Sequence, residues 1–158
     1  MNKPLYVPGP GVPDAIEKMP PWLALPLLFG KAHSEIHEAT LAPADPEEYG
    51  DVRDVLEAIA EACGHPWEDV MAAATKAMRE APAAHGWSRP ETVAMLHEAV
   101  EAAALDLGNP APLSAALLMT ARLAAIYGVD WAAVEASSAE KRARKGGFTG
   151  HMFWRPLV

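Results

Sequence analysis

Two short acidic segments carry the residues whose chemistry is easiest to read in this sequence. Glu35 and Glu38 are three residues apart, and Glu48 and Asp51 repeat that spacing after a short interval. Residues three apart on a helix are neighbours on one face, so two adjacent helices would gather four carboxylates. At ~4 Å, two such charges repel by about 1 kcal/mol in water and about 4 kcal/mol in a less polar site. The cluster therefore predicts a bound cation, and its oxygen ligands favour Mg²⁺ or Mn²⁺ over zinc.

A second candidate group lies near the C-terminus of a chain whose formal net charge is −8. Four cations precede a Gly-Gly-Phe sequence: Lys141, Arg142, Arg144 and Lys145. Cations followed by glycine are also a normal way to end a helix. The functional interpretation is a phosphate clamp, in which Lys and Arg donate hydrogen bonds and glycine permits close backbone approach.

Two alternatives apply to these polar residues. His33 and His37 have a four-residue spacing that would suit zinc, but a helical wheel places them opposite the carboxylates. We therefore favour packed or capping histidines. Each acidic pair, taken alone, could be an ordinary solvated helix face. Two pairs joined by a short loop and followed by an apolar helix favour a site.

The composition predicts a helical protein. Apolar residues make up 51% of the 158 residues, alanine is frequent and aromatic residues are 7%, which favours helix over sheet. The negative charge argues against nucleic-acid binding. Cys63 is the single cysteine, so no intrachain disulfide can form. Without a long uncharged run or a signal pattern, we expect a soluble, cytoplasmic protein that does not enter a membrane.

Local signals place the helices. Residues 1–21 are rich in proline and should be extended over the body of the protein. A first helix is expected over 22–41, interrupted or kinked near Pro26. Asp45 is a good N-cap for a second helix that runs to about Cys63, and a third helix begins near Trp67.

The second half of the chain resembles the first at a shift of 64 residues. The shift aligns Gly64 with Gly128, Trp67 with Trp131 and His33 with His97, among other pairs. We therefore expect an all-α helical bundle built as one domain, 1–158, from two tandem degenerate repeats, 22–87 and 88–158, that form a pseudo-dimer. The four acids of repeat one align with residues that cannot bind metal: Ala99, Ala102, Pro112 and Ala115. A merely solvated face would not explain why the acids occur in one copy.

These motifs resemble those of the all-α nucleoside triphosphate pyrophosphohydrolases, the MazG-like and phosphoribosyl-ATP pyrophosphohydrolase-like proteins. The family pattern is Glu-x-x-Glu, a spacer and Glu-x-x-Asp. A terminal Lys-Arg-x-x-Arg-Gly-Gly-Phe-like element, matched by 141–148, is typical of the second group. The segment 13–18 is similar to that group's opening segment, although 6–12 has lost its basic residues. Ser34 stands where many relatives have another acid, so Glu47 or Asp54 could join the metal shell.

The resemblance implies a metal-dependent hydrolase that converts a nucleoside triphosphate to the monophosphate and pyrophosphate. Two or more Mg²⁺ or Mn²⁺ ions would be held by Glu35, Glu38, Glu48 and Asp51. Glu38, or Glu35, would act in catalysis, with Glu38 as the candidate base. The substrate-binding residues would be Lys31, Lys141, Arg142, Arg144, Lys145 and Asp54. Five tryptophans are candidates to stack on a base or, more simply, to fill the core: Trp22, Trp67, Trp87, Trp131 and Trp154.

A purine deoxynucleotide such as dGTP or dATP is the substrate we expect, for control of the nucleotide pool; dUTP and damaged nucleotides are also compatible. Phosphoribosyl-ATP is disfavoured because the basic N-terminal segment is missing. We expect the pseudo-dimeric chains to form a homo-oligomer. Two alternatives stay open: a catalytically inactive bundle that binds nucleotide or a partner helix, and a structural helical dimer with an acidic surface.

Overall fold

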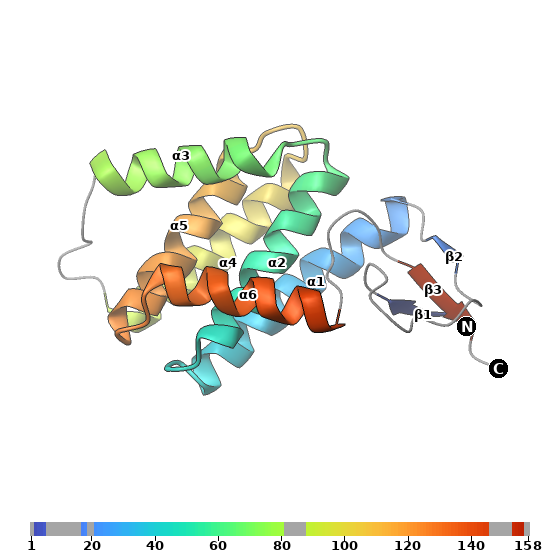
Figure 1. The fold of residues 1–158 in the computed structure, drawn as a ribbon. Coiled ribbons are helices and arrows are strands. Elements are labelled where there is room, and N and C mark those ends of the chain that lie inside the picture. The colour runs from blue at the N-terminus through green and yellow to red at the C-terminus, as the bar shows by residue number, and fades with distance from the viewer. Residues whose placement is uncertain (1, 6–16, 19–20, 81–87, 146–152, 157–158) are drawn as a thin grey trace.

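Six helices form the body of the protein in a computed structural model, which describes residues 2–5, 17–18, 21–80, 88–145 and 153–156. The helices are α1 (Pro21–Leu41), α2 (Pro46–Ala62), α3 (Trp67–Glu80), α4 (Arg89–Leu105), α5 (Ala111–Ile126) and α6 (Trp131–Lys145). They pack into one bundle (Figure 1), which confirms the all-α expectation for the core of the fold. Helix α1 continues through Pro26 without a break, so the interruption that was the first of the two expectations for this proline does not occur.

The two ends of the chain meet in a small sheet that the sequence did not predict. Strand β3 (Phe153–Pro156) lies between β1 (Asn2–Leu5) and β2 (Glu17–Lys18), and both pairings are antiparallel. The sheet sits beside the end of the bundle where α1 begins (Figure 1). The N-terminal segment, 1–21, was expected to be extended; residues 2–5 and 17–18 are extended as strands, whereas Pro21 already begins α1.

The start of α2 follows from its capping residues. The Asp45 side chain accepts a hydrogen bond from the backbone N–H of Glu47 at 2.9 Å, and Pro46 is the first helical residue. Glu47 and Glu48 occupy the first turn, where negative charge is favourable. This local chemistry fixes the position of Glu48 in α2 and therefore the direction in which its carboxylate projects.

Helices α2 and α5 occupy the centre of the bundle. Their fully buried side chains include Tyr49, Leu56 and Ile59 from α2 and Leu113 and Leu123 from α5. Helix α1 packs on α2, and α4 packs on α5. Helix α6 lies on α2, whereas α3 lies on α5. The third helix of each half of the chain therefore packs on the second helix of the other half.

The turns that end α2 and α5 are alike. Gly64 and Gly128 both have positive φ, 79° and 73°, a backbone conformation that glycine adopts without the steric penalty of a Cβ atom. Each is followed three residues later by the tryptophan that begins the next helix, Trp67 for α3 and Trp131 for α6. The shared turn aims the third helix of each half away from its own second helix.

Candidate functional site

The two predicted acidic pairs meet where α1 packs against α2. Ligand oxygens of Glu35, Glu38 and Glu48 all lie within 4.8 Å of one another. Glu35 is 4% exposed, Glu48 is half-buried and Glu38 is exposed. The site is therefore open to solvent at Glu38 and closed at Glu35. We call these three residues the carboxylate triad.

The triad contains buried oxygen atoms that the protein does not satisfy. Glu35 Oε1 is 2.6 Å from Lys31 Nζ, one turn earlier on α1. Glu35 Oε2 and Glu48 Oε2 are buried and have no hydrogen-bond partner among the described residues. A buried carboxylate oxygen without a partner is costly. These two atoms are acceptors that a bound cation would satisfy.

Burial and mutual repulsion affect the protonation of the triad. Desolvation raises the pKa of the Glu35 carboxyl to about 7, against the opposing effect of Lys31 and with the help of Glu38 and Asp51. The pKa of Glu48 is also raised, first by burial and then by the charges of Asp51 and Glu38. Because protons and metal ions compete for the same oxygens, cation binding should strengthen as the pH rises through this range.

Asp51, the fourth predicted metal ligand, is bound to a lysine from the other half of the chain. Lys141 Nζ of α6 lies 2.6 Å from Asp51 Oδ1 and 2.8 Å from Asp51 Oδ2, and 3.2 Å from Glu47 Oε1. Burial opposes the charge of Lys141, but the hydrogen bonds and charges of Asp51 and Glu47 outweigh it and raise its pKa to about 12. The structure thus brings Lys141 to the acidic site, with its ammonium group on Asp51.

The other predicted substrate-binding cations are placed differently. Arg142 Nη1 is 3.3 Å from Glu57, and its Nε is 3.9 Å from Asp54. Arg144 is 51% exposed and pairs with Glu140 on its own helix at 3.0 Å, so it does not reach the triad. The side chain of Lys145 and the Gly-Gly-Phe sequence, 146–148, lie outside the described residues.

Asp54 belongs to a buried polar network between α2 and α6. The Ser138 hydroxyl and the Arg53 guanidinium both donate to Asp54 Oδ1. Arg53 also donates to Glu57 and, through Nε, to both oxygens of Glu135 at 3.1 Å. Neither Asp54 nor Glu47 joins the triad, so the structure gives no support for placing either in the metal shell.

Of the two histidines of α1, one is packed and the other is exposed. His33 stacks on His97 of α4, with ring centroids 4.9 Å apart and an interplanar angle of 14°. Their Nδ1 atoms are 2.6 Å apart. His37 is exposed. Among the described residues, the carboxylate triad is the one set of three or more His, Cys, Asp or Glu side chains whose ligand atoms are close enough to share an ion. The described histidines therefore do not form a zinc site.

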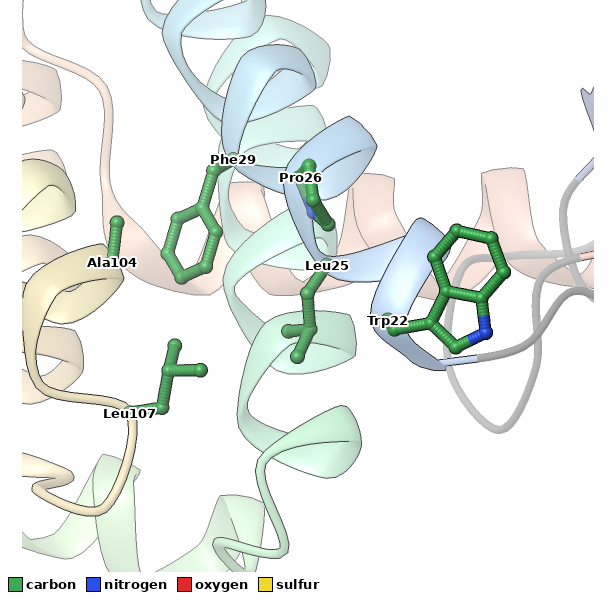
Figure 2. Close-up of a pocket in the computed structure, with 6 residues that line it drawn as sticks. All are labelled: Trp22, Leu25, Pro26, Phe29, Ala104 and Leu107. Carbon is green, nitrogen blue, oxygen red and sulfur yellow. The ribbon is translucent and has the colours of Figure 1, made fainter.

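An apolar pocket of about 390 Å³ lies between the beginning of α1 and the end of α4. Figure 2 shows Leu25, Phe29 and Leu107 around this space, with Trp22 at its edge. Trp22 is 75% exposed. The lining contains no carboxylate, so this pocket is separate from the triad.

The other tryptophan side chains that the structure describes have packing roles. Trp67 is buried, and the Arg53 guanidinium carbon lies 5.3 Å from its ring centroid. Trp131 is partly buried and packs against the core. Trp87 and the side chain of Trp154 lie outside the described residues.

Sequence reasoning did not identify three groups that shape the site. Arg53, Glu135 and Ser138 fix α6 against α2, and this interface carries Lys141 to Asp51. A charged residue at position 53, directly after Val52 and three residues before Leu56, borders the apolar face of α2 and was the available signal. A buried arginine needs carboxylate partners, but the sequence did not show that one of them, Glu135, comes from α6.

None of the α-helices in the described ranges is by itself long and apolar enough to cross a membrane; α5 and α6 meet that test only when counted together across a 111° bend. Comparisons with protein-family models, curated proteins and solved structures return no match for this chain. The family resemblance drawn from the motifs therefore stays a hypothesis. The geometry of the site has to carry the functional conclusion.

Proposed function

We propose that this protein is a metal-dependent nucleoside triphosphate pyrophosphohydrolase. The observation that carries the proposal is the carboxylate triad, in which two helices place three carboxylates within 4.8 Å of one another and leave two buried oxygens without a partner. Lys141, a cation suited to phosphate, lies at the edge of this group on Asp51. Carboxylates that need a cation, next to a lysine, are the chemistry expected of a phosphoryl-transfer site.

The residues present fit Mg²⁺ or Mn²⁺. Glu35, Glu38 and Glu48 would hold the cation, because they supply hard oxygen ligands and include the unsatisfied Oε2 atoms,. When bound, such an ion would neutralise phosphate charge and make a water molecule more acidic. With Asp51 included, the ligand set would hold two or more ions.

The protein's own residues would then bind substrate and move a proton. Lys141 would donate hydrogen bonds to the phosphates, with Arg142 one residue further along α6. Glu38 is exposed, so its carboxylate is open to a water molecule and can accept its proton. The water oxygen would form a bond to the α-phosphorus while the bond from that phosphorus to the bridging oxygen breaks, which releases pyrophosphate.

We also propose that the chain is a tandem duplication that acts as a pseudo-dimer with one site. The start positions of α3 and α6, the Gly64 and Gly128 turns, and the exchange of third helices between the halves support it. At the 64-residue shift Lys141 corresponds to Ala77, and the triad corresponds to residues without carboxylates: Ala99, Ala102 and Pro112. The second half would therefore supply the scaffold and Lys141, and the first half the acids.

We propose a purine deoxynucleoside triphosphate such as dGTP or dATP as substrate, in a cytoplasmic role in nucleotide-pool control. We further propose that the chains associate. Exposed apolar side chains at Trp22 (75%), Leu41 (71%) and Leu105 (89%) support association. The inactive nucleotide-binding bundle is the alternative, and it predicts metal or nucleotide binding without turnover.

The test is release of pyrophosphate from a panel of ribo- and deoxynucleoside triphosphates with Mg²⁺, Mn²⁺ or EDTA. We expect metal-dependent pyrophosphate release that Glu38→Gln abolishes. Glu98→Gln, which changes an exposed glutamate on α4, is the matched control and should retain activity. Release of orthophosphate would point to another phosphohydrolase. Metal-dependent nucleotide binding with no turnover of any nucleotide would favour the inactive bundle.

A further inference from the structure

The ammonium group of Lys141 occupies a position at Asp51 that a metal ion would need. It contacts both Asp51 oxygens, at 2.6 Å and 2.8 Å, and Glu47 at 3.2 Å. Three carboxylate oxygens around one cation resemble a small coordination shell. Asp51 lies one turn from Glu48 on α2, yet its oxygens do not belong to the group that can share an ion.

The net charge around the site limits how many cations it can bind. Five carboxylates meet there, from Glu35, Glu38, Glu47, Glu48 and Asp51, and two lysines face them. Lys31 pairs with Glu35 and Lys141 pairs with Asp51 and Glu47. When all groups are ionised, the excess is three negative charges. One divalent cation on the triad removes most of that excess, so a second cation gains little until more negative charge arrives.

A polyphosphate would bring that charge. Lysine is a compact donor on a flexible four-carbon stem, and its pair with Asp51 is partly exposed, with 24% of the Lys141 side chain open to solvent,. Phosphate oxygens and the Asp51 carboxylate are therefore competing partners for one ammonium group. Movement of Lys141 to the phosphates would release both Asp51 oxygens.

We infer that Lys141 is a displaceable counter-ion that withholds Asp51 from metal until a polyphosphate binds. One divalent ion binds the carboxylate triad first. The polyphosphate then draws Lys141 from Asp51, and Asp51 completes the ligand set for a second ion. Lys141 is thus a positioning residue that orders the assembly of the site. This inference rests on the proposed metal-dependent function but concerns binding rather than turnover.

The first test counts bound Mn²⁺ without nucleotide, from the electron paramagnetic resonance signal of the free ion. We expect one ion per wild-type chain, none for Glu48→Gln, and two for Lys141→Met. The double variant Lys141→Met/Asp51→Asn should return to one ion. Lys76→Met, at an exposed lysine of α3, is the matched control and should bind one.

Other numbers of bound Mn²⁺ ions would separate failure of this inference from failure of the proposed function. Two ions on the wild-type chain, or one ion on Lys141→Met, would overturn the inference while leaving the metal site in place. No bound Mn²⁺ on the wild type or any variant would remove the proposed function as well. If Lys141→Met does not fold, Asp51→Asn gives the reciprocal count: it should still bind one ion, and binding of none would show that Asp51 is a ligand of the first.

The second test measures binding of inorganic triphosphate by calorimetry to protein loaded with one Mn²⁺ per chain, because the triad ion is inferred to bind before the polyphosphate. Asp51→Asn should tighten binding about two- to fivefold, the range that a partly exposed ion pair supports, because Lys141 no longer has to leave Asp51. In the Lys141→Met background the same change should give a smaller gain. An equal gain in both backgrounds would show that Asp51 acts by repulsion alone and that no exchange of Lys141 occurs.

Discussion

The imidazoles of His33 and His97 stack between α1 and α4 with their Nδ1 atoms 2.6 Å apart. At that distance one ring must donate and the other accept, so at least one nitrogen must be unprotonated. The pair joins two positions separated by 64 residues, the shift at which the proposed repeats align. The contact therefore links α1, the helix that carries Glu35 and Glu38, to α4.

This pair should make stability depend on pH. The pKa of His97 is lowered, first by burial, then by His33 and His37, with Glu101 opposing. The unfolded chain then binds the proton more readily, so the stabilising contribution is present above about pH 6.5 and is lost as the pH falls below it. In urea unfolding, the free energy of unfolding at pH 7.5 minus that at pH 5.5 should be less positive for His97→Gln than for wild type.

His37→Gln is the control for this prediction, because His37 is exposed on the same helix as His33. Its stability difference between the two pH values should stay closer to the wild-type value than that of His97→Gln. An unchanged pH dependence in His97→Gln would contradict the assignment of the effect to the stacked pair.

Glu35→Gln should stabilise the metal-free protein at pH 8. The folded-state pKa of about 7 lies above the ordinary value of 4.5, so the protonated form is favoured on folding and stability is lost as the pH rises from 4.5 through 7. The shift corresponds to roughly 3 kcal/mol. Loss of the Lys31 pair offsets part of it, so we expect a gain of about 1–2 kcal/mol in the free energy of unfolding.

The gain should shrink toward zero at pH 4.5, where Glu35 is protonated in the folded protein. Glu98→Gln should leave the stability close to that of wild type at both pH values. A Glu35→Gln variant that is less stable than wild type at pH 8 would show that the ionised Glu35 carboxylate does not destabilise the folded protein.

Mn²⁺ should raise the melting temperature of wild type and have little effect on Glu48→Gln. A ligand that binds the folded state at 100 times its dissociation constant stabilises by about 2.7 kcal/mol, and Glu48 supplies an unsatisfied buried oxygen to the triad. Differential scanning calorimetry with MnCl₂ or with EDTA measures the effect. Equal stabilisation of both proteins would place the ion elsewhere.

Gly50 should accept alanine and reject a long side chain. A Cβ atom there would lie 3.5 Å from the Cβ and the backbone nitrogen of Ser138, which is ordinary contact distance. Because glycine is about 1 kcal/mol less favourable than alanine inside a helix, Gly50→Ala should be neutral or stabilising. Gly50→Leu should destabilise by about 1–3 kcal/mol through overpacking between α2 and α6, as measured by urea unfolding.

Arg53→Met should destabilise by about 3 kcal/mol or more. Arg53 is 4% exposed and contacts carboxylates of Asp54, Glu57 and Glu135. Its removal leaves buried negative charges without their partner. The control Arg144→Met breaks an exposed pair on α6 and should change stability by less than about 1 kcal/mol. Similar losses for the two variants would mean that the buried network is not needed for folding.

Local sequence patterns were sufficient to place the first three helices and the face on which the acids lie. Asp45 and Pro46 begin α2 as expected, and the glycine at 64 follows its end. The three-residue spacing was sufficient to place Glu35 and Glu38 together, because helical geometry alone fixes that relation. The Gly-x-x-Trp sequence that occurs at 64–67 and again at 128–131 marks the two similar turns after α2 and α5.

Tertiary structure decided which acids are available to a cation. Asp51 and Asp54 continue the acidic series of α2, yet one is bound by Lys141 and the other by Ser138 and Arg53. The sheet formed by β1, β2 and β3 likewise pairs the two ends of the chain. A helical wheel specifies the face that a residue occupies but not the helix that will cover it. Lys141, the partner of Asp51, and Ser138, one of the partners of Asp54, come from α6, more than 80 residues away, so the roles of both acids depend on how α6 packs on α2.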